Sequence, residues 1–162
     1  MIKFNLPISL SFVVGVICIS SAAWAASTGS ITISGVVAQH TDIVVASVAG
    51  YNALDLSATA TDLTVANVTE KNNTTLGYKV TLSSANAGKL KNGTLGYVTY
   101  TAKYNATSVA LSTTPTNVTT SAAATSIVNV TKPFKISYTG VDTTTLMQGT
   151  YSDTLTFTIA SP

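Results

Sequence analysis

The 162-residue chain contains no arginine, and it has a single cysteine, a single tryptophan and a single histidine. Its eight basic residues, all lysines, stand against six acids. Arginine is the side chain that most often reads bases and phosphates, and this small net charge produces little electrostatic attraction for polyanions. A lone cysteine forms no intrachain disulfide. The composition therefore excludes a nucleic-acid reader and a disulfide-stapled scaffold.

The N-terminus has the pattern of a secretory signal peptide. Lys3 is followed by an apolar run from Ile8 to Ile19 and by the small-x-small triplet Ala23-Trp24-Ala25. A membrane-spanning helix is disfavoured because the run is short and no basic cluster follows it. We predict a signal peptide over residues 1–25 and a single domain over residues 26–162. Cleavage would remove Cys18 and Trp24, leaving a mature chain without cysteine or tryptophan.

Residues for catalysis or metal binding are scarce. His40 stands alone in a polar connection, with no cysteine nucleophile and no nucleophile-elbow motif in the mature chain, and we interpret it as a solvated loop residue. The acids are dispersed and do not follow a calcium-loop pattern. We predict no enzyme activity, no catalytic residue, no metal and no cofactor.

Alternating apolar and polar residues dominate the rest of the chain and are typical of half-buried strands. The clearest example is the C-terminal stretch, which we predict to be one strand over residues 149–160, with Leu155, Phe157 and Ile159 on one face. Ile31, Ile33 and Val37 alternate near the start of the mature chain. No segment has helical spacing. An antiparallel β-sandwich is therefore predicted, with a closed barrel as the alternative.

Turn signals divide the chain between these strands. Residues 70–75 are predicted to be a turn, and Asn92-Gly93 predicts a hairpin with a two-residue type I′ turn. Val68 lies out of phase with the strand that starts at Leu63, which indicates a bulge. Residues 113–125 lack periodicity and are predicted to be a surface loop or a weak edge. The remaining strands are predicted over 42–48, 78–83, 98–104, 109–111, 127–130 and 134–138.

Asn-x-Ser/Thr sequons are frequent, and tyrosines cluster at 97, 100 and 104. The sequons fit either glycosylation or the chance product of a chain rich in threonine and asparagine, and we favour chance. The tyrosines fit either a sugar-stacking surface or ordinary strand packing, and we favour packing.

The C-terminal sequence Gly149-Thr-Tyr-Ser-Asp-Thr-Leu155 and the alternation after it resemble the last strand of bacterial chaperone-usher pilins, in particular the archaic, spore coat U-like branch. The opening Ile31-Thr-Ile-Ser-Gly-Val-Val37, followed by Asp42-Ile-Val-Val45, also resembles these subunits. The chain departs from many of them in lacking the cysteines for a disulfide on the first strand.

The resemblance implies an immunoglobulin-like sandwich that lacks one strand and is completed by the N-terminal strand of a neighbouring subunit. The donated strand would span about residues 30–38, and its inserting positions would be Ile31, Ile33, Gly35 and Val37. The groove would be formed with the last strand, at Tyr151, Leu155, Phe157 and Ile159. The implied partners are other pilins, a periplasmic chaperone and an outer-membrane usher. The implied location is the surface of a Gram-negative bacterium, reached through the periplasm, with no stable membrane insertion after cleavage.

Two functions are compatible with the sequence. In the first, the chain is a structural subunit of a surface fibre, and residues 31–37 are donated to a neighbour. In the second, it is a self-contained secreted β-sandwich that acts as an adhesin or carbohydrate-binding module, and residues 31–37 complete its own sheet.

Overall fold

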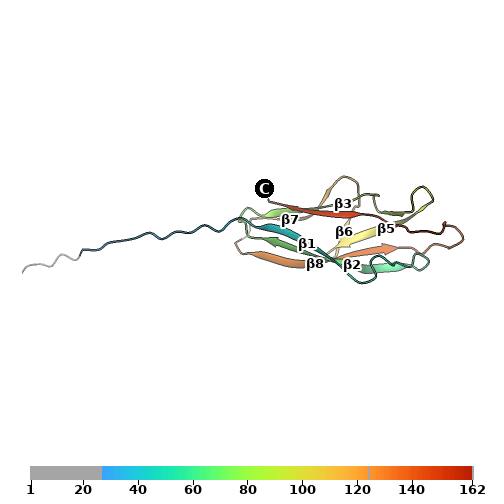
Figure 1. The fold of residues 1–162 in the computed structure, drawn as a ribbon, viewed down its shortest axis with the longest axis horizontal. Helices are drawn as coiled ribbons and strands as arrows, with labels where there is room; N and C mark the ends of the chain where they lie inside the picture. The colour runs from blue at the N-terminus through green and yellow to red at the C-terminus, as the bar shows by residue number, and fades with distance from the viewer. Residues whose placement is uncertain (1–26, 124, 162) are drawn as a thin grey trace, which may run out of the picture. The chain divides into compact units, whose positions relative to one another are not determined.

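A computed structural model describes residues 27–123 and 125–161. The described chain is all-β, with antiparallel sheets and no helix (Figure 1). It accordingly contains no helix long and apolar enough to cross a membrane. The predicted signal peptide lies outside the described residues.

The described residues form nine strands in two sheets. The larger sheet has the order β1-β2-β8-β5-β4, with β6 paired to β5, and the smaller has the order β7-β3-β9. Their bounds are β1 Thr41–Ser47, β2 Ala60–Asn72, β3 Tyr78–Ser84, β4 Lys89–Lys91, β5 Tyr97–Tyr104, β6 Thr107–Val109, β7 Thr116–Ser121, β8 Val128–Tyr138 and β9 Leu155–Ala160.

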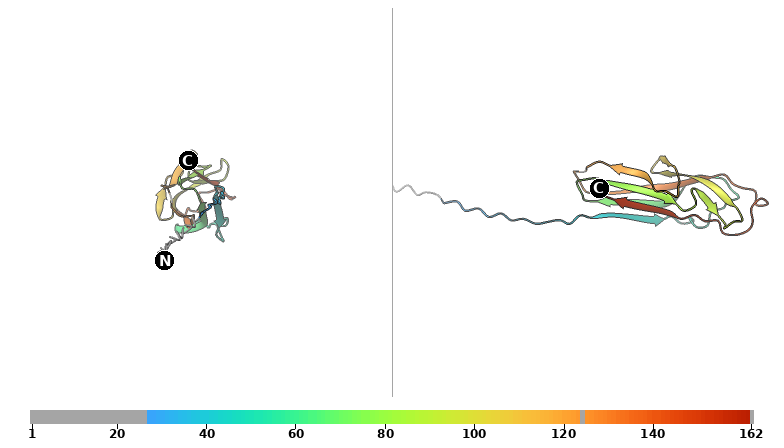
Figure 2. Two further views of the ribbon diagram at one scale, coloured as in Figure 1. Left: turned by 90° about the vertical axis from the view of Figure 1, so that its left-hand side faces the viewer. Right: turned by 90° about the horizontal axis from the view of Figure 1, so that it is seen from above.

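The two sheets pack face to face around a shared core (Figure 2). Leu82 of β3 and Phe134 of β8 are almost completely buried. Phe157 of β9 packs edge-on against Phe134, with ring centroids 5.4 Å apart, and thus joins the smaller sheet to the larger. Because β1 and β9 form no ladder with each other, the strands do not close into a barrel.

Several predictions of local structure are confirmed. The alternating face of β5 is buried at Val98, Tyr100, Ala102 and Tyr104. The bulge predicted ahead of Val68 appears as a register shift between Thr64 and Ala66. The unpatterned stretch 113–125 contains β7, an edge strand that pairs only with β3 within the described part of the chain.

Two turn predictions are wrong in detail. Residues 70–72 do not turn but continue β2, and Glu70 is fully buried there. The hairpin at Asn92-Gly93 exists, but its loop spans residues 92–96 because the amide of Asn92 donates to the carbonyl of Gly96. Only Gly93 of the pair has a positive φ, of 53°, whereas a type I′ turn needs two.

The strand predicted over residues 31–37 is also absent, since residues 27–40 belong to no strand. A strand needs a hydrogen-bonding partner, and residues 31–37 pair with no strand of the described chain. The described chain divides into a short N-terminal segment, residues 27–36, and one compact unit that begins at Val37. The exposed apolar residues of the short segment are Ile31, Ile33 and Val36.

Candidate functional site

The most distinctive feature of the sandwich is the seam between its edge strands β1 and β9. These strands lie side by side and point in opposite directions (Figures 1 and 2). Among the residues that the structure describes, β1 pairs only with β2, and β9 pairs only with β3. Each strand therefore presents one unpaired backbone edge to the seam, and such edges attract a further strand.

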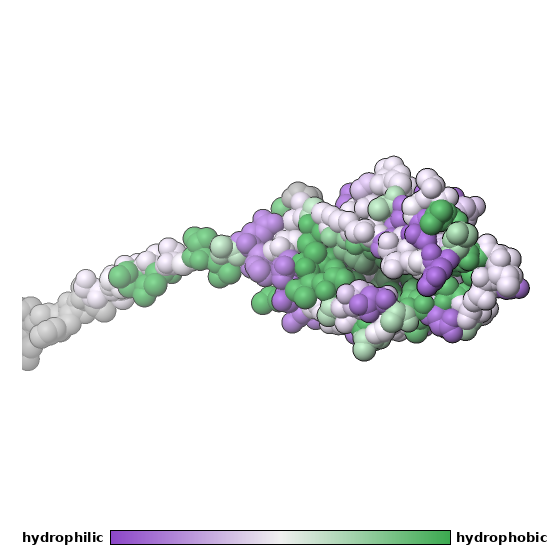
Figure 3. All heavy atoms as spheres, turned by 45° about the vertical axis from the view of Figure 1, so that its right-hand side comes forward, coloured by the Kyte–Doolittle hydropathy of each residue, from purple (hydrophilic) through white to green (hydrophobic). Residues whose placement is uncertain are grey.

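Between these two edges lies a hydrophobic groove, which we call the seam groove. Its walls include Val45 of β1 and Leu155 and Phe157 of β9, and its floor includes Ala66 of β2 and Phe134 of β8. The cavity there measures about 300 Å³. Figure 3 shows a hydrophobic band with a hollow in its middle on this face of the molecule.

Side chains along the groove point inward but are incompletely covered. Val45 faces the interior, yet 49% of its surface is exposed. Leu155 and Phe157 are half-buried, whereas their partners on β3, Ser84 and Leu82, are almost fully buried. The seam thus lacks the covering that a further strand would supply.

The beginning of β9 is held in place by Asp153. One carboxylate oxygen accepts hydrogen bonds from Ser84 Oγ at 2.6 Å and Tyr100 Oη at 2.7 Å. The other accepts from the backbone amides of Asn86 and Thr154. Burial, together with the bond to this carboxylate, raises the pKa of Tyr100, so its hydroxyl remains a donor.

Tyr151 does not belong to the last strand, contrary to the prediction. β9 begins at Leu155, because Ser152 bridges to Lys91 of the larger sheet and Asp153 is bound to β3 and β5. Tyr151 instead lies in the preceding loop, where its hydroxyl donates to the carbonyl of Met147.

Gly149 has a steric role in the same loop. A Cβ at this position would collide with the side-chain amide of Asn92. Gly149 also has a φ of 152°, which residues with a side chain rarely adopt, so the glycine of the C-terminal motif is explained by its backbone conformation together with this crowding.

A buried carboxylate connects the two sheets beneath the groove. Glu70 of β2 accepts hydrogen bonds from Tyr78 Oη at 2.8 Å, Tyr104 Oη at 2.6 Å, Thr119 Oγ1 at 2.9 Å and Lys132 Nζ at 2.7 Å. These donors come from β3, β5, β7 and β8. Tyr104 also packs against Phe157, with ring centroids 5.7 Å apart. The cluster therefore supports the groove wall from below.

Burial by itself raises the pKa of the Glu70 carboxyl, but the hydrogen bonds from Lys132 and the three hydroxyl groups outweigh it and hold this pKa below its ordinary value. Sequence analysis missed Glu70 because it was assigned to a turn. Its spacing from Ala66 and Val68 was the available signal, since the three alternate on the buried face of β2.

The residues predicted to insert into a neighbour lie just ahead of β1. Ile31, Ile33 and Val37 are each more than four-fifths exposed, and Gly35 has open space around it. Among the described residues, the first hydrogen bond to the sandwich is at Ala38, whose carbonyl accepts a hydrogen bond from Asn73 Nδ2 at 2.9 Å. Asn73 Oδ1 accepts in turn from the amide of His40. His40 is thus an exposed residue at the start of the sandwich, as predicted.

No three His, Cys, Asp or Glu side chains within residues 27–123 and 125–161 are grouped as metal ligands. No protein-family model matches the sequence, and a search of curated proteins found no match.

Proposed function

We propose that this protein is a structural subunit of a surface fibre, assembled by adding a β-strand from one copy to the seam groove of the next. In this proposal the sandwich is immunoglobulin-like, as in the chaperone-usher pilins that the sequence resembles. The observation that carries the proposal is the open seam, where two unpaired strand edges flank an apolar floor.

Residues 31–37 have the chemistry that the seam groove requires. They are seven residues long, the same length as β1. Ile31, Ile33 and Val37 would enter the groove while Thr32 and Ser34 face solvent, because successive side chains of a strand point to opposite faces. Burying each of the three apolar side chains contributes about 1.5–3 kcal/mol. Gly35 would pass where the groove is shallowest.

The direction of insertion decides whether a fibre or a closed pair forms. We call the end of the sandwich where β1 starts the root end, and the end formed by loops 48–59 and 139–154 the loop end. An inserted strand that runs parallel to β1 leaves the groove at the loop end, because β1 itself ends there. The donor's root end then meets the acceptor's loop end. Such a heterologous contact repeats into an open fibre.

The reverse direction would bring two root ends together and allow two copies to exchange strands reciprocally. We therefore propose insertion parallel to β1 and antiparallel to β9. Before assembly, the open groove would expose unpaired edges that aggregate. A periplasmic chaperone would cover them, and an outer-membrane usher would release the growing fibre at the cell surface.

The self-contained alternative requires residues 31–37 to pair with their own sheet. They belong to no strand in this structure, which favours donation to a neighbour.

The test compares two substitutions in the N-terminal segment. Ile33→Asp places a carboxylate in an apolar groove and should remove the heat-labile ladder from gels of unboiled surface material, because an unpaired buried charge is strongly unfavourable. Ser34→Asp is the matched control, since it adds the same charge on the solvent face, and it should retain the ladder. In both variants the sandwich should remain folded by circular dichroism.

A second measurement tests the groove directly. A synthetic peptide of residues 30–38 should bind the Ile33→Asp chain, whose groove is intact but whose own segment is disabled. A wild-type protein that stays monomeric at high concentration, together with an Ile33→Asp chain that unfolds or does not bind the peptide, would exclude fibre assembly by strand donation.

A further inference from the structure

The two ends of the sandwich have different surfaces. At the root end, the turn before β3 exposes 63% of Leu76, and the residue before β8, Ile127, is 79% exposed. At the loop end lies a cleft of about 410 Å³ whose apolar lining includes Leu146 and Met147. Met147 is 61% exposed, and its unbranched side chain adapts easily to a partner. One end thus has apolar protrusions and the other an apolar recess.

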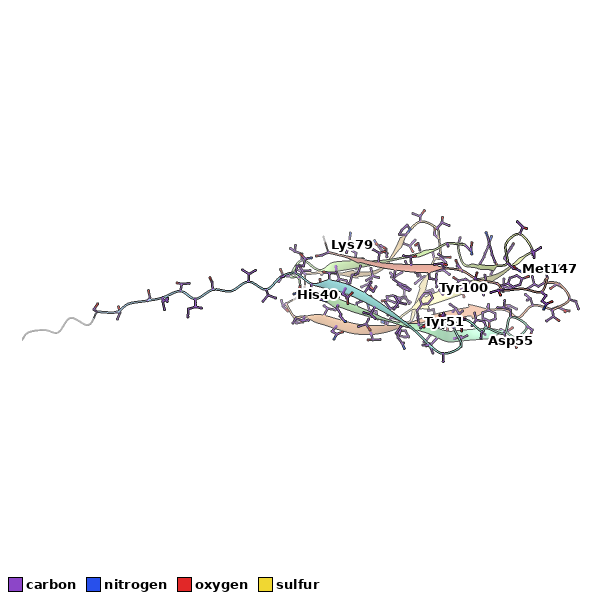
Figure 4. All side chains as sticks on the ribbon, viewed as in Figure 1. His40, Tyr51, Asp55, Lys79, Tyr100 and Met147 are labelled. Atoms are coloured by element: carbon purple, nitrogen blue, oxygen red, sulfur yellow. The ribbon has the colours of Figure 1, made fainter. Side chains whose placement is uncertain are left out.

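The charges at the two ends are also complementary. Asp55 and Asp142 lie at the loop end, and their hydrogen bonds come from Ser57 and Thr144 in their own turns. Neither takes part in an ion pair within the described residues, and Lys79, at the root end, also forms none there. Figure 4 shows Lys79 and His40 at one end of the sandwich and Asp55 and Met147 at the other.

The stretch from Val37 to Thr41, which joins the N-terminal segment to β1, is too short to keep the sandwich of a donor far from the neighbour that receives its strand. Ala38 and His40 are both bonded to Asn73, so the chain is fixed to its own root end directly after Val37. From Val37 to Thr41 the backbone can reach at most about 14 Å. A donor whose Val37 lies in a neighbour's groove must therefore bring its root end close to that neighbour.

We infer that the root end of one copy docks on the loop end of the next, with Leu76 and Ile127 against the cleft at Leu146 and Met147 and with Lys79 facing Asp55 and Asp142. This inference rests on the proposed function and adds to it a second contact, made by residues outside the donated strand. The contact would stiffen the fibre at each junction and slow its dissociation.

The experiment separates this contact from strand donation. Fibres of the wild type and of the Met147→Glu and Ile127→Glu variants are diluted, and their dissociation rates are measured at a fixed temperature. Each variant should dissociate at least about tenfold faster, because a carboxylate against an apolar recess loses its hydration. Thr99→Glu, which adds the same charge on the outer face of β5, should dissociate at the wild-type rate.

Peptide binding shows whether the groove is intact in these variants. The 30–38 peptide should bind the Ile33→Asp chain with the same affinity, within about twofold, whether or not that chain also carries Met147→Glu, since additivity holds for separate sites. A charge exchange provides a further check: Lys79→Glu should speed dissociation, and combining it with Asp142→Lys should restore much of the wild-type rate.

The outcomes are distinguishable. If the peptide binds but all fibres dissociate at one rate, the docking contact is wrong and strand donation stands. If the peptide does not bind the Ile33→Asp chain, strand donation fails and the docking inference fails with it. Peptide binding together with faster dissociation only in the root-end and loop-end variants supports both.

Discussion

Breaking the buried Glu70–Lys132 pair should destabilise the sandwich far more than breaking an exposed pair of similar length. The Lys132 Nζ lies 2.7 Å from the Glu70 carboxylate, and the Glu70 side chain is completely shielded from solvent. Removing one partner of such a pair leaves a charge that is neither hydrated nor paired, which typically costs about 3–5 kcal/mol.

For Glu70→Gln, we expect the loss of unfolding free energy to lie near the lower end of that range. Lys132 keeps a hydrogen bond to Thr119 Oγ1 at 2.9 Å, and its ammonium stays 5.4 Å from the ring centre of Tyr104. We therefore expect a loss of about 3 kcal/mol, since the lysine is not left without partners. For a domain of this size, the melting temperature should fall by roughly 10 °C.

The assay is a double-mutant cycle measured by urea denaturation of the monomeric Ile33→Asp background. The cycle combines Glu70→Gln with Lys132→Met. The control cycle, Asp62→Asn with Lys103→Met, removes an ion pair of 2.9 Å whose two side chains are both partly exposed. The control should show a much smaller coupling, because water screens that pair. Equal coupling in the two cycles would refute the claim that burial sets the strength of the Glu70 cluster.

The Glu70 cluster should also make the stability of the sandwich depend on pH. The pKa of Glu70 in the folded state lies below its ordinary value of 4.5, so the unfolded chain binds a proton first as the pH falls. The stability from the carboxylate is then fully present above pH 4.5 and declines as the pH falls through the lower, folded-state value. The wild type should lose stability in this acid range more steeply than Glu70→Gln does. A variant with the same acid profile as the wild type would show that another group is responsible.

Two further predictions concern the N-terminus and the start of β9. The exported protein should have the intact mass of a chain that starts at Ala26, with tyrosine-like fluorescence and no tryptophan band, and a mass that still includes Trp24 would contradict the signal-peptide prediction. Asp153→Asn should cost about 1–3 kcal/mol in urea denaturation, because the amide replaces one oxygen that accepts from Ser84 and Tyr100. It should also weaken binding of the 30–38 peptide, and an unchanged affinity would show that β9 keeps its position without Asp153.

Much of the fold follows from local patterns. The alternation in residues 98–104 and 134–138 is enough to assign both strands and their buried faces, because a period of two reflects the geometry of a single strand. The change of phase before Val68 located the bulge of β2 for the same reason. The absence of helical spacing pointed to an all-β domain, and the absence of cysteine after the predicted cleavage site pointed to a domain that depends on its core.

The predictions that were wrong concern residues whose placement depends on contacts with residues distant in the sequence. Glu70 appeared to belong to a turn because it is charged, and it is buried only because donors from four other strands converge on it. Tyr151 appeared to continue the last strand, but Asp153 is bonded to Ser84 and Tyr100, and this delays the strand until Leu155. Neither arrangement can be deduced from the residues nearby.

The seam groove, too, could be predicted in part from local patterns and in part not. Alternation in the sequence predicted that residues 31–37 and 155–159 are each apolar on one face, and residues 155–159 lie in β9. The meeting of β1 and β9 as unpaired edges with a cavity between them could not be predicted, because strand order is set by packing between distant segments. The tertiary structure also placed Asn73 beside Ala38 and His40, and so determined where the N-terminal segment becomes part of the sandwich.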